Sequence, residues 1–134
     1  MIQTRIFLDA NVLFSAAYRP ASRIARLWRL RNVELVTSLY AAEEARVNLS
    51  EHSQLQRLEK LLGRMRIVSG LAPFPHSVLL PEKDRPILQA AIHCKATHLL
   101  TGDKLHFGRY FGTKIMGVLI LLPSQYFRIY LKDS

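Results

Sequence analysis

The chain has 134 residues, 49% of them hydrophobic, and its 19 basic and 10 acidic residues give a formal net charge of +9. That length can bury one core, so we expect a single domain over residues 1–134. One cysteine excludes an internal disulfide, and no apolar run approaches the length of a membrane span. We therefore expect a soluble, cytoplasmic protein without membrane contact, whose basic surplus favours polyanions such as nucleic acid.

A strand followed by a helix is predicted at the start of the chain. Residues 5–8 are apolar and too few for a helix, and they stop at Asp9. Asn11 follows, and an apolar helix begins beside it. In an open α/β sheet the carboxyl ends of parallel strands share the edge where ligands bind, so this carboxylate is expected at that edge.

The next helix is predicted from Ser22, a favourable N-cap residue. Its inward face is apolar and includes Trp28, which we expect in the core. Arg23 and Arg26 share the opposite face and could line the route of a nucleic acid. A solvated charged face is the commoner explanation of such residues, and the residues alone leave both interpretations open.

Residues 33–36 predict a second strand, and the two polar residues after it cap a helix over 39–49. Glu43 and Glu44 lie just over one turn from that cap. We expect one of them to reach the edge where the strands end. The alternative is an exposed acid that interacts favourably with the helix dipole.

An amphipathic helix is predicted between residues 50 and 65, with leucines on one face and Arg57 and Lys60 on the solvent-facing side. The leucine row could serve a partner or a second copy of the chain. In a small α/β domain, however, one face of each helix covers the sheet, so core packing is expected. A short strand at 67–68 and a proline-rich loop over 69–81 follow.

Residues 80–104 are the most informative stretch. Asp84 stands at a helix N-cap, a proline occupies the first turn, and the helix is predicted to end near Lys95. Residues 98–100 form a short apolar strand, and Asp103 follows it after Thr-Gly. One carboxylate therefore begins the helix and another ends the strand.

The joint placement of Asp9, Asp84 and Asp103 predicts chemistry. Two carboxylates about 4 Å apart repel by about 4 kcal/mol at an effective dielectric near 20, so the cluster requires protonation or a cation. Oxygen ligands without thiolate or paired imidazole select Mg²⁺ or Mn²⁺, which polarise a phosphoryl oxygen and lower the pKa of bound water. Each acid alone has a simple account as a cap or turn residue, but together they fit a phosphodiester and a divalent cation.

The segment after Asp103 is rich in basic and aromatic residues. Lys104, His106 and Arg109 could contact phosphates, and the aromatic rings could stack on bases, although packing is the commoner role of such rings. Asn11 and Thr101 could orient the aspartates or a water, with capping and turn formation as alternatives.

Three motifs in this order, DANVLFSA, EKDRPILQAAI and LLTGDK, resemble the PIN-domain family of metal-dependent ribonucleases. Residues 118–127 also look like the family's last strand and helix, so the resemblance covers nearly the whole chain. It implies a three-layer α/β/α fold with a central, mainly parallel sheet of four to five short strands. It also implies four acids that bind Mg²⁺ or Mn²⁺ and carry catalysis: Asp9, Glu44, Asp84 and Asp103.

Glu44 is selected over Glu43 because the family places its glutamate just before an apolar position, here Ala45. The resemblance further implies an endoribonuclease similar to the VapC-type toxins, dimeric and silenced by a small antitoxin protein, with RNA as substrate. Two alternatives remain. One is a catalytically silent PIN-like module that binds nucleic acid. The other is a phosphoryl-transfer domain. Receiver domains, which belong to this class, place a pair of acids directly after the first strand, where this chain has Asp9 alone.

Overall fold

The computed structural model describes residues 3–131 and contains a central, mainly parallel sheet. The strand order is β3-β2-β1-β4-β6-β5, and only the pairing of β5 with β6 is antiparallel. The strands are β1 (Thr4–Leu8), β2 (Val33–Ser38), β3 (Arg66–Val68), β4 (His98–Leu100), β5 (Lys114–Ile115) and β6 (Val118–Leu121). The α/β class is confirmed, with six described strands in place of the expected four to five.

The additional strand, β5, has only two residues and forms a tight hairpin with β6. Met116 and Gly117 make its turn with φ of 50° and 86°. Left-handed backbone at both turn positions suits a two-residue hairpin. A two-residue strand shows no apolar alternation, which is why the sequence pattern missed it.

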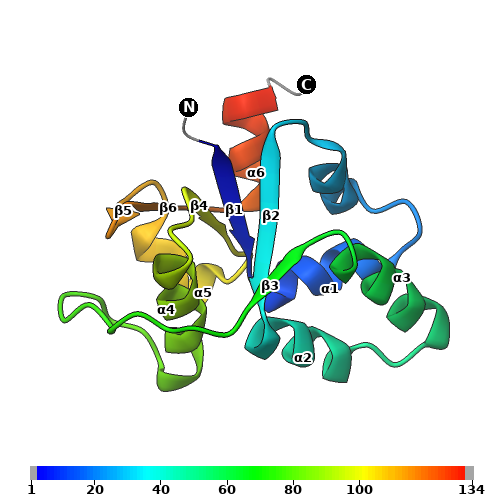
Figure 1. Cartoon of the computed structure of the whole chain (residues 1–134), viewed down its shortest axis with the longest axis horizontal. Coiled ribbons are helices and arrows are strands. Elements are labelled where there is room, and N and C mark those ends of the chain that lie inside the picture. The colour runs from blue at the N-terminus through cyan, green and yellow to red at the C-terminus, as the bar shows by residue number, and fades with distance from the viewer. Residues whose placement is uncertain (1–2, 132–134) are drawn as a thin grey trace.

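Helices lie on both sides of the strands, with α1 and α3 on one side and α4 and α5 on the other (Figure 1). Among the described residues, no helix is long and apolar enough to cross a membrane. The helical segments are α1 (Ala10–Tyr18), η1 (Arg23–Arg29), α2 (Leu39–Asn48), α3 (His52–Leu62), η2 (Glu82–Asp84), α4 (Arg85–His93), α5 (Lys104–Phe107), η3 (Gly108–Tyr110), α6 (Pro123–Tyr126) and η4 (Phe127–Leu131).

The core is centred on β1 and β4, whose apolar side chains are almost completely buried. Trp28 is 6% exposed, as predicted, and its Nε1 donates a 3.0 Å hydrogen bond to the carbonyl of Leu61. Cys94 is also buried, and this burial raises the pKa of its thiol. The described chain therefore uses its single cysteine as a small packing residue.

Two local predictions differ from the structure. The helix after Ser22 is a 3₁₀ helix, although Ser22 caps it as expected by accepting from the backbone N–H of Ile24. Helix α4 ends at His93, because Lys95 adopts a left-handed φ of 58° that cannot continue an α-helix.

Arg57 is not the purely solvated residue that the helical pattern predicts. Its guanidinium donates to the carbonyls of Ala17 and Tyr18, at 2.9 and 3.2 Å. These carbonyls belong to the last turn of α1, where helical acceptors lack partners within the helix. Arg57 therefore ties α3 to the end of α1, whereas Lys60 is exposed.

Candidate metal centre

The residues that follow β1 and β4, together with α1, the second half of α2 and η2, surround one pocket of about 360 Å³. The carboxyl edge of the sheet lies at its lower side in Figure 1. All four acids selected from the sequence line the pocket. The lining residues are Asp9, Ala10, Asn11, Phe14, Glu44, Ala45, Asn48, Lys83, Asp84 and Asp103.

Asp9 is the most deeply buried of these acids, with 5% of its surface exposed. Its Oδ1 accepts from the backbone N–H of Ala10 at 2.6 Å, so it caps α1. Burial raises the pKa of Asp9 to about 6, against the lowering effect of its hydrogen bonds, and the negative charges of Glu44 and Asp84 add to the increase. An acid held charged at this position therefore destabilises the apo protein unless a cation binds nearby.

Thr101 and Asn11 hold the aspartates in place. The buried hydroxyl of Thr101 donates to Asp9 Oδ2 at 2.7 Å and accepts from the backbone N–H of Asp103 at 3.1 Å. Asn11 Nδ2 lies 3.3 Å from both Asp9 Oδ2 and Thr101 Oγ1, and its Oδ1 accepts from the N–H of Gly102 at 2.7 Å. These contacts join the ends of β1 and β4.

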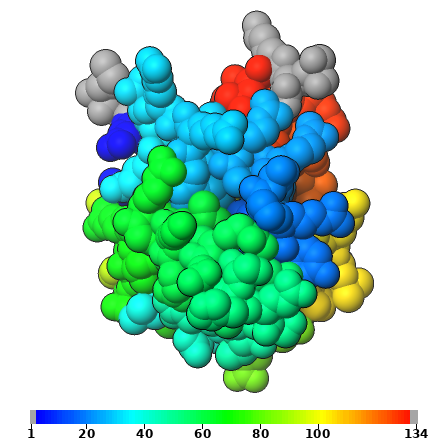
Figure 2. Space-filling view, turned by 90° about the vertical axis from the view of Figure 1, so that its right-hand side faces the viewer, coloured from blue at the N-terminus to red at the C-terminus, as the bar shows by residue number. Residues whose placement is uncertain are grey.

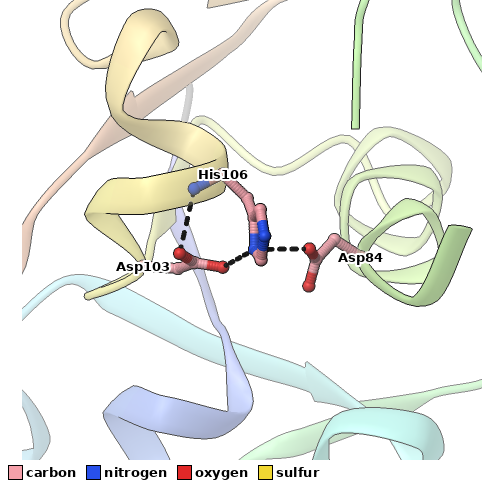
Figure 3. A group of neighbouring side chains, drawn as sticks. All are labelled: Asp84, Asp103 and His106. Atoms are coloured by element: carbon pink, nitrogen blue, oxygen red, sulfur yellow. Dashed lines mark hydrogen bonds and ion pairs between the residues drawn. The ribbon is translucent and has the colours of Figure 1, made fainter. Parts of the chain in front are cut away.

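Asp84, Asp103 and His106 form a compact group at the other side of the pocket (Figure 3). Asp103 Oδ1 accepts from the backbone N–H of His106 at 3.0 Å and caps α5. His106 Nδ1 lies 2.8 Å from Asp103 Oδ2 and 3.0 Å from Asp84 Oδ2. The sequence leaves open whether His106 contacts phosphate or is a surface histidine, and in the structure its ring lies between two carboxylates.

Asp84 occupies the position before α4 that the sequence predicts, yet its side chain forms no cap hydrogen bond. Its Oδ2 is buried and makes no hydrogen bond, because the contact with His106 is close enough for an ion pair but lacks hydrogen-bond geometry. Burial raises the pKa of Asp84, Asp103 adds to the increase, and His106 and Lys83 oppose it. Helix capping therefore does not explain this acid.

The donor set fits a divalent cation. Among residues 3–131, this is the one group of three or more His, Cys, Asp or Glu side chains whose ligand atoms all lie within 4.8 Å of one another. A metal with six ligands at about 2.1 Å separates neighbouring ligand atoms by about 3 Å. The separations of His106 Nδ1 from the two carboxylates match that spacing, so Asp84, Asp103 and His106 could hold such an ion.

The structure distinguishes the two glutamates of α2. Both glutamates are exposed, but Glu44 lines the pocket, whereas Glu43 lies outside the lining and pairs with Arg46 at 3.4 Å. Tyr40 lies one turn before Glu44, and its hydroxyl donates to the carbonyl of Lys83 at 2.7 Å. This bond connects α2 to the segment that carries Asp84.

Sequence reasoning missed Lys83 and Tyr40. Lys83 is the one cation among the described residues that line the pocket, and burial with the negative charges of Glu44, Asp84 and Asp9 raises the pKa of Tyr40. The sequence does contain a signal for Lys83, because this basic residue directly precedes Asp84 in EKDR. For Tyr40 the sequence holds no signal, because its contact depends on how α2 packs against a distant segment.

The basic residues proposed for substrate contact lie outside the pocket lining. Lys104 and Arg109 are exposed on α5 and η3, the segments that follow Asp103. Arg26 places its guanidinium 5.3 Å from the ring centroid of Phe127. Arg23 lines two other hollows of the surface.

This fold and site define a class: α/β domains with an acidic, metal-competent pocket at the carboxyl edge of a parallel sheet. A model of the PIN domain matches residues 5–105, and the chain belongs to the PIN-domain family. No curated protein sequence matches the chain.

Solved structures share the fold, and two of them are VapBC structures. One is VapBC2 from Rickettsia felis bound to a DNA fragment from its promoter, with a TM-score of 0.63, 17% identity, and 87% of this chain and 97% of that chain covered. The other is VapBC-1 from nontypeable Haemophilus influenzae, with a TM-score of 0.59, 17% identity, and 90% and 99% covered. The expected PIN-like architecture is thus confirmed.

Proposed function

We propose that this protein is an endoribonuclease that hydrolyses RNA phosphodiester bonds with Mg²⁺ or Mn²⁺ held by Asp9, Glu44, Asp84 and Asp103. The observation that carries the proposal is that these four acids, in a chain of net charge +9, line one pocket. A basic surface attracts a polyanion, and the acids accommodate the cation that its cleavage requires.

The side chains of this site have separable roles in the proposed reaction. A bound divalent ion would polarise the scissile phosphoryl group and lower the pKa of a water. Asp84 and Asp103 would offer oxygens to such an ion, and His106 Nδ1 lies beside them. Thr101 and Asn11 donate hydrogen bonds to the Asp9 carboxylate and orient it, and Lys83, which lines the pocket, would place a positive charge near a bound phosphate.

The biological role that we propose is that of the toxin in a toxin–antitoxin pair, acting in the cytoplasm. Two solved structures that share this fold are VapBC complexes. By analogy, the proposed partners are a small antitoxin protein and a second copy of this chain, with RNA as the substrate.

A silent nucleic-acid-binding PIN module is the second candidate, and the state of Asp84 disfavours it. A buried carboxylate oxygen without a hydrogen bond destabilises a fold, and Asp84 Oδ2 is such an atom. In a protein that only binds RNA, the Asp84 carboxylate would lower the stability of the fold without a function that offsets this cost. A phosphoryl-transfer domain would also need an acceptor side chain in the pocket, where Asp9 already carries two close hydrogen bonds.

The test is cleavage of single-stranded RNA by purified protein with Mg²⁺, with Mn²⁺ and with EDTA. Cleavage is expected only with a divalent ion, and Asp84→Asn and Asp103→Asn are expected to abolish it while the circular dichroism spectrum is retained. Glu43→Gln is the matched control, because Glu43 is exposed and outside the pocket. Robust cleavage in EDTA, or by both Asp variants, overturns the proposal.

A further inference from the structure

One face of α1 leads away from the acidic pocket. Asn11, Phe14, Ser15 and Tyr18 share it at the i, i+3, i+4 and i+7 spacing of a helix face and are partly or fully exposed. The opposite face is buried in the core. The helix is about 13 Å long at 1.5 Å per residue, so this outward face connects the pocket to a surface one helix length away.

Two further hollows continue that face. The acidic pocket shares Phe14 with a hollow of about 330 Å³ that includes Tyr18 and Arg19. That hollow shares Arg23 with a third one, of about 300 Å³, which includes Arg128. Figure 2 shows the segment of α1 and η1 at the surface of this side of the molecule, beside the C-terminal segment. The three hollows therefore lie next to one another on the surface, each sharing a lining residue with the next.

The chemistry changes along these three hollows. The acidic pocket carries three Asp and one Glu, whereas the described residues that line the two further hollows include arginines and no acid. The rings of Phe14 and Tyr18 stack with centroids 5.3 Å apart and planes at 30°. Tyr18 is 47% exposed and so offers a ring face to solvent. Exposed aromatic rings interleaved with arginines are the components of a single-strand nucleic-acid site.

We propose that single-stranded RNA binds along this α1 path, defined by Phe14, Tyr18, Arg19, Arg23 and Arg128, with its scissile phosphate at the acidic pocket. The proposal rests on the proposed ribonuclease function. The acids repel phosphates, so cations next to them are needed to hold the strand. Stacking on Tyr18 requires unpaired bases, which favours a single strand over a duplex.

The test measures binding of 5′-labelled oligouridines of about four and about twelve nucleotides to the full chain in EDTA, by fluorescence anisotropy over a range of salt. Arg19→Gln is expected to weaken binding of the long strand and to flatten the slope of log affinity against log salt by about 0.7. Tyr18→Ala is expected to weaken it by roughly tenfold, and Tyr18→Phe to retain it, because stacking needs only the ring.

Lys60→Gln is the matched control, because it removes the same charge from an exposed position on α3 outside the path. Equal effects of Arg19→Gln and Lys60→Gln, or an unchanged affinity in Tyr18→Ala, overturn the path. Poly-glutamate is tested as a competitor. If it binds as tightly as RNA and Arg19→Gln weakens both to the same extent, the RNA path is overturned in favour of an acidic peptide as the occupant.

The ribonuclease function is tested separately, by metal-dependent cleavage of RNA by the wild-type protein. Cleavage by wild type with unaltered RNA binding in all path variants rejects the path and retains the ribonuclease. Wild-type protein that neither binds nor cleaves RNA rejects both.

Discussion

The hydroxyl of Thr101 donates a 2.7 Å hydrogen bond to Asp9 Oδ2, although the two residues are 92 positions apart in the chain. Both side chains are buried, Thr101 completely. The bond connects the carboxyl ends of β1 and β4 and favours the charged form of Asp9 against the effect of burial. The central acid of the site thus depends on a neutral side chain from another strand.

Thr101→Val is expected to destabilise the protein by about 1–3 kcal/mol, because the nearly isosteric change leaves Asp9 Oδ2 without its closest partner. It should also raise the pKa of Asp9 above its present value near 6. Urea unfolding near pH 7.5 measures the first effect. Thr101→Ser retains the hydroxyl and serves as the control. Equal stability of the valine variant and wild type would show that the bond contributes little.

Asp9→Asn is expected to stabilise the metal-free protein in a pH-dependent manner. The pKa of Asp9 is raised from 3.8 to about 6, so ionised Asp9 destabilises the native state by about 3 kcal/mol above pH 6. Below pH 4 both the native and unfolded states are protonated, and the difference vanishes. The stability contributed by protonation is therefore lost as pH rises from about 4 to 6.

The amide introduced by Asp9→Asn would remain neutral throughout that range. The stability of the variant relative to wild type should therefore increase between pH 4 and 6. The amide is a weaker hydrogen-bond acceptor than a carboxylate, and this difference reduces the gain in stability. Thermal melting at several pH values without divalent metal measures this difference. A difference that does not change with pH would contradict the burial argument. Added Mg²⁺ should reduce the difference in melting temperature between Asp9→Asn and wild type, because the cation stabilises only the charged site.

Glu44→Gln is expected to weaken Mn²⁺ binding, whereas Glu43→Gln should leave it close to wild type. Glu44 lines the pocket, whereas Glu43 lies outside the lining and is paired with Arg46. Isothermal titration calorimetry of both variants provides the comparison, with each serving as the other's control. The opposite ranking would place Glu43 at the site in solution.

His106→Gln is expected to lower the affinity for Co²⁺ by about tenfold and that for Mg²⁺ by less, because an imidazole nitrogen favours later transition metals over Mg²⁺. The prediction follows from the position of Nδ1, 2.8 and 3.0 Å from two carboxylate oxygens. The visible spectrum of bound Co²⁺ reports the ligand change directly. His52→Gln, at an exposed position on α3, is the control. Equal losses for both metals would mean that His106 only positions the acids.

Much of the site's framework is predictable from the sequence. The apolar runs before Asp9 and Asp103 mark two strands, and both prove to be neighbouring parallel strands whose carboxyl ends meet. The proline after Asp84 marks the start of α4. These signals are local, since hydrophobic periodicity and capping chemistry depend only on nearby residues.

The tertiary structure alone determined the direction of the side chains. Adjacent residues of a helix point about 100° apart, so Glu44 reaches the pocket only because Ala41, Ala42 and Ala45 pack inward and set the rotation of α2. His106 meets Asp84 only because α5 lies against the first turn of α4. Local patterns determine where an element ends, but contacts between segments distant in the chain determine which side chains meet there.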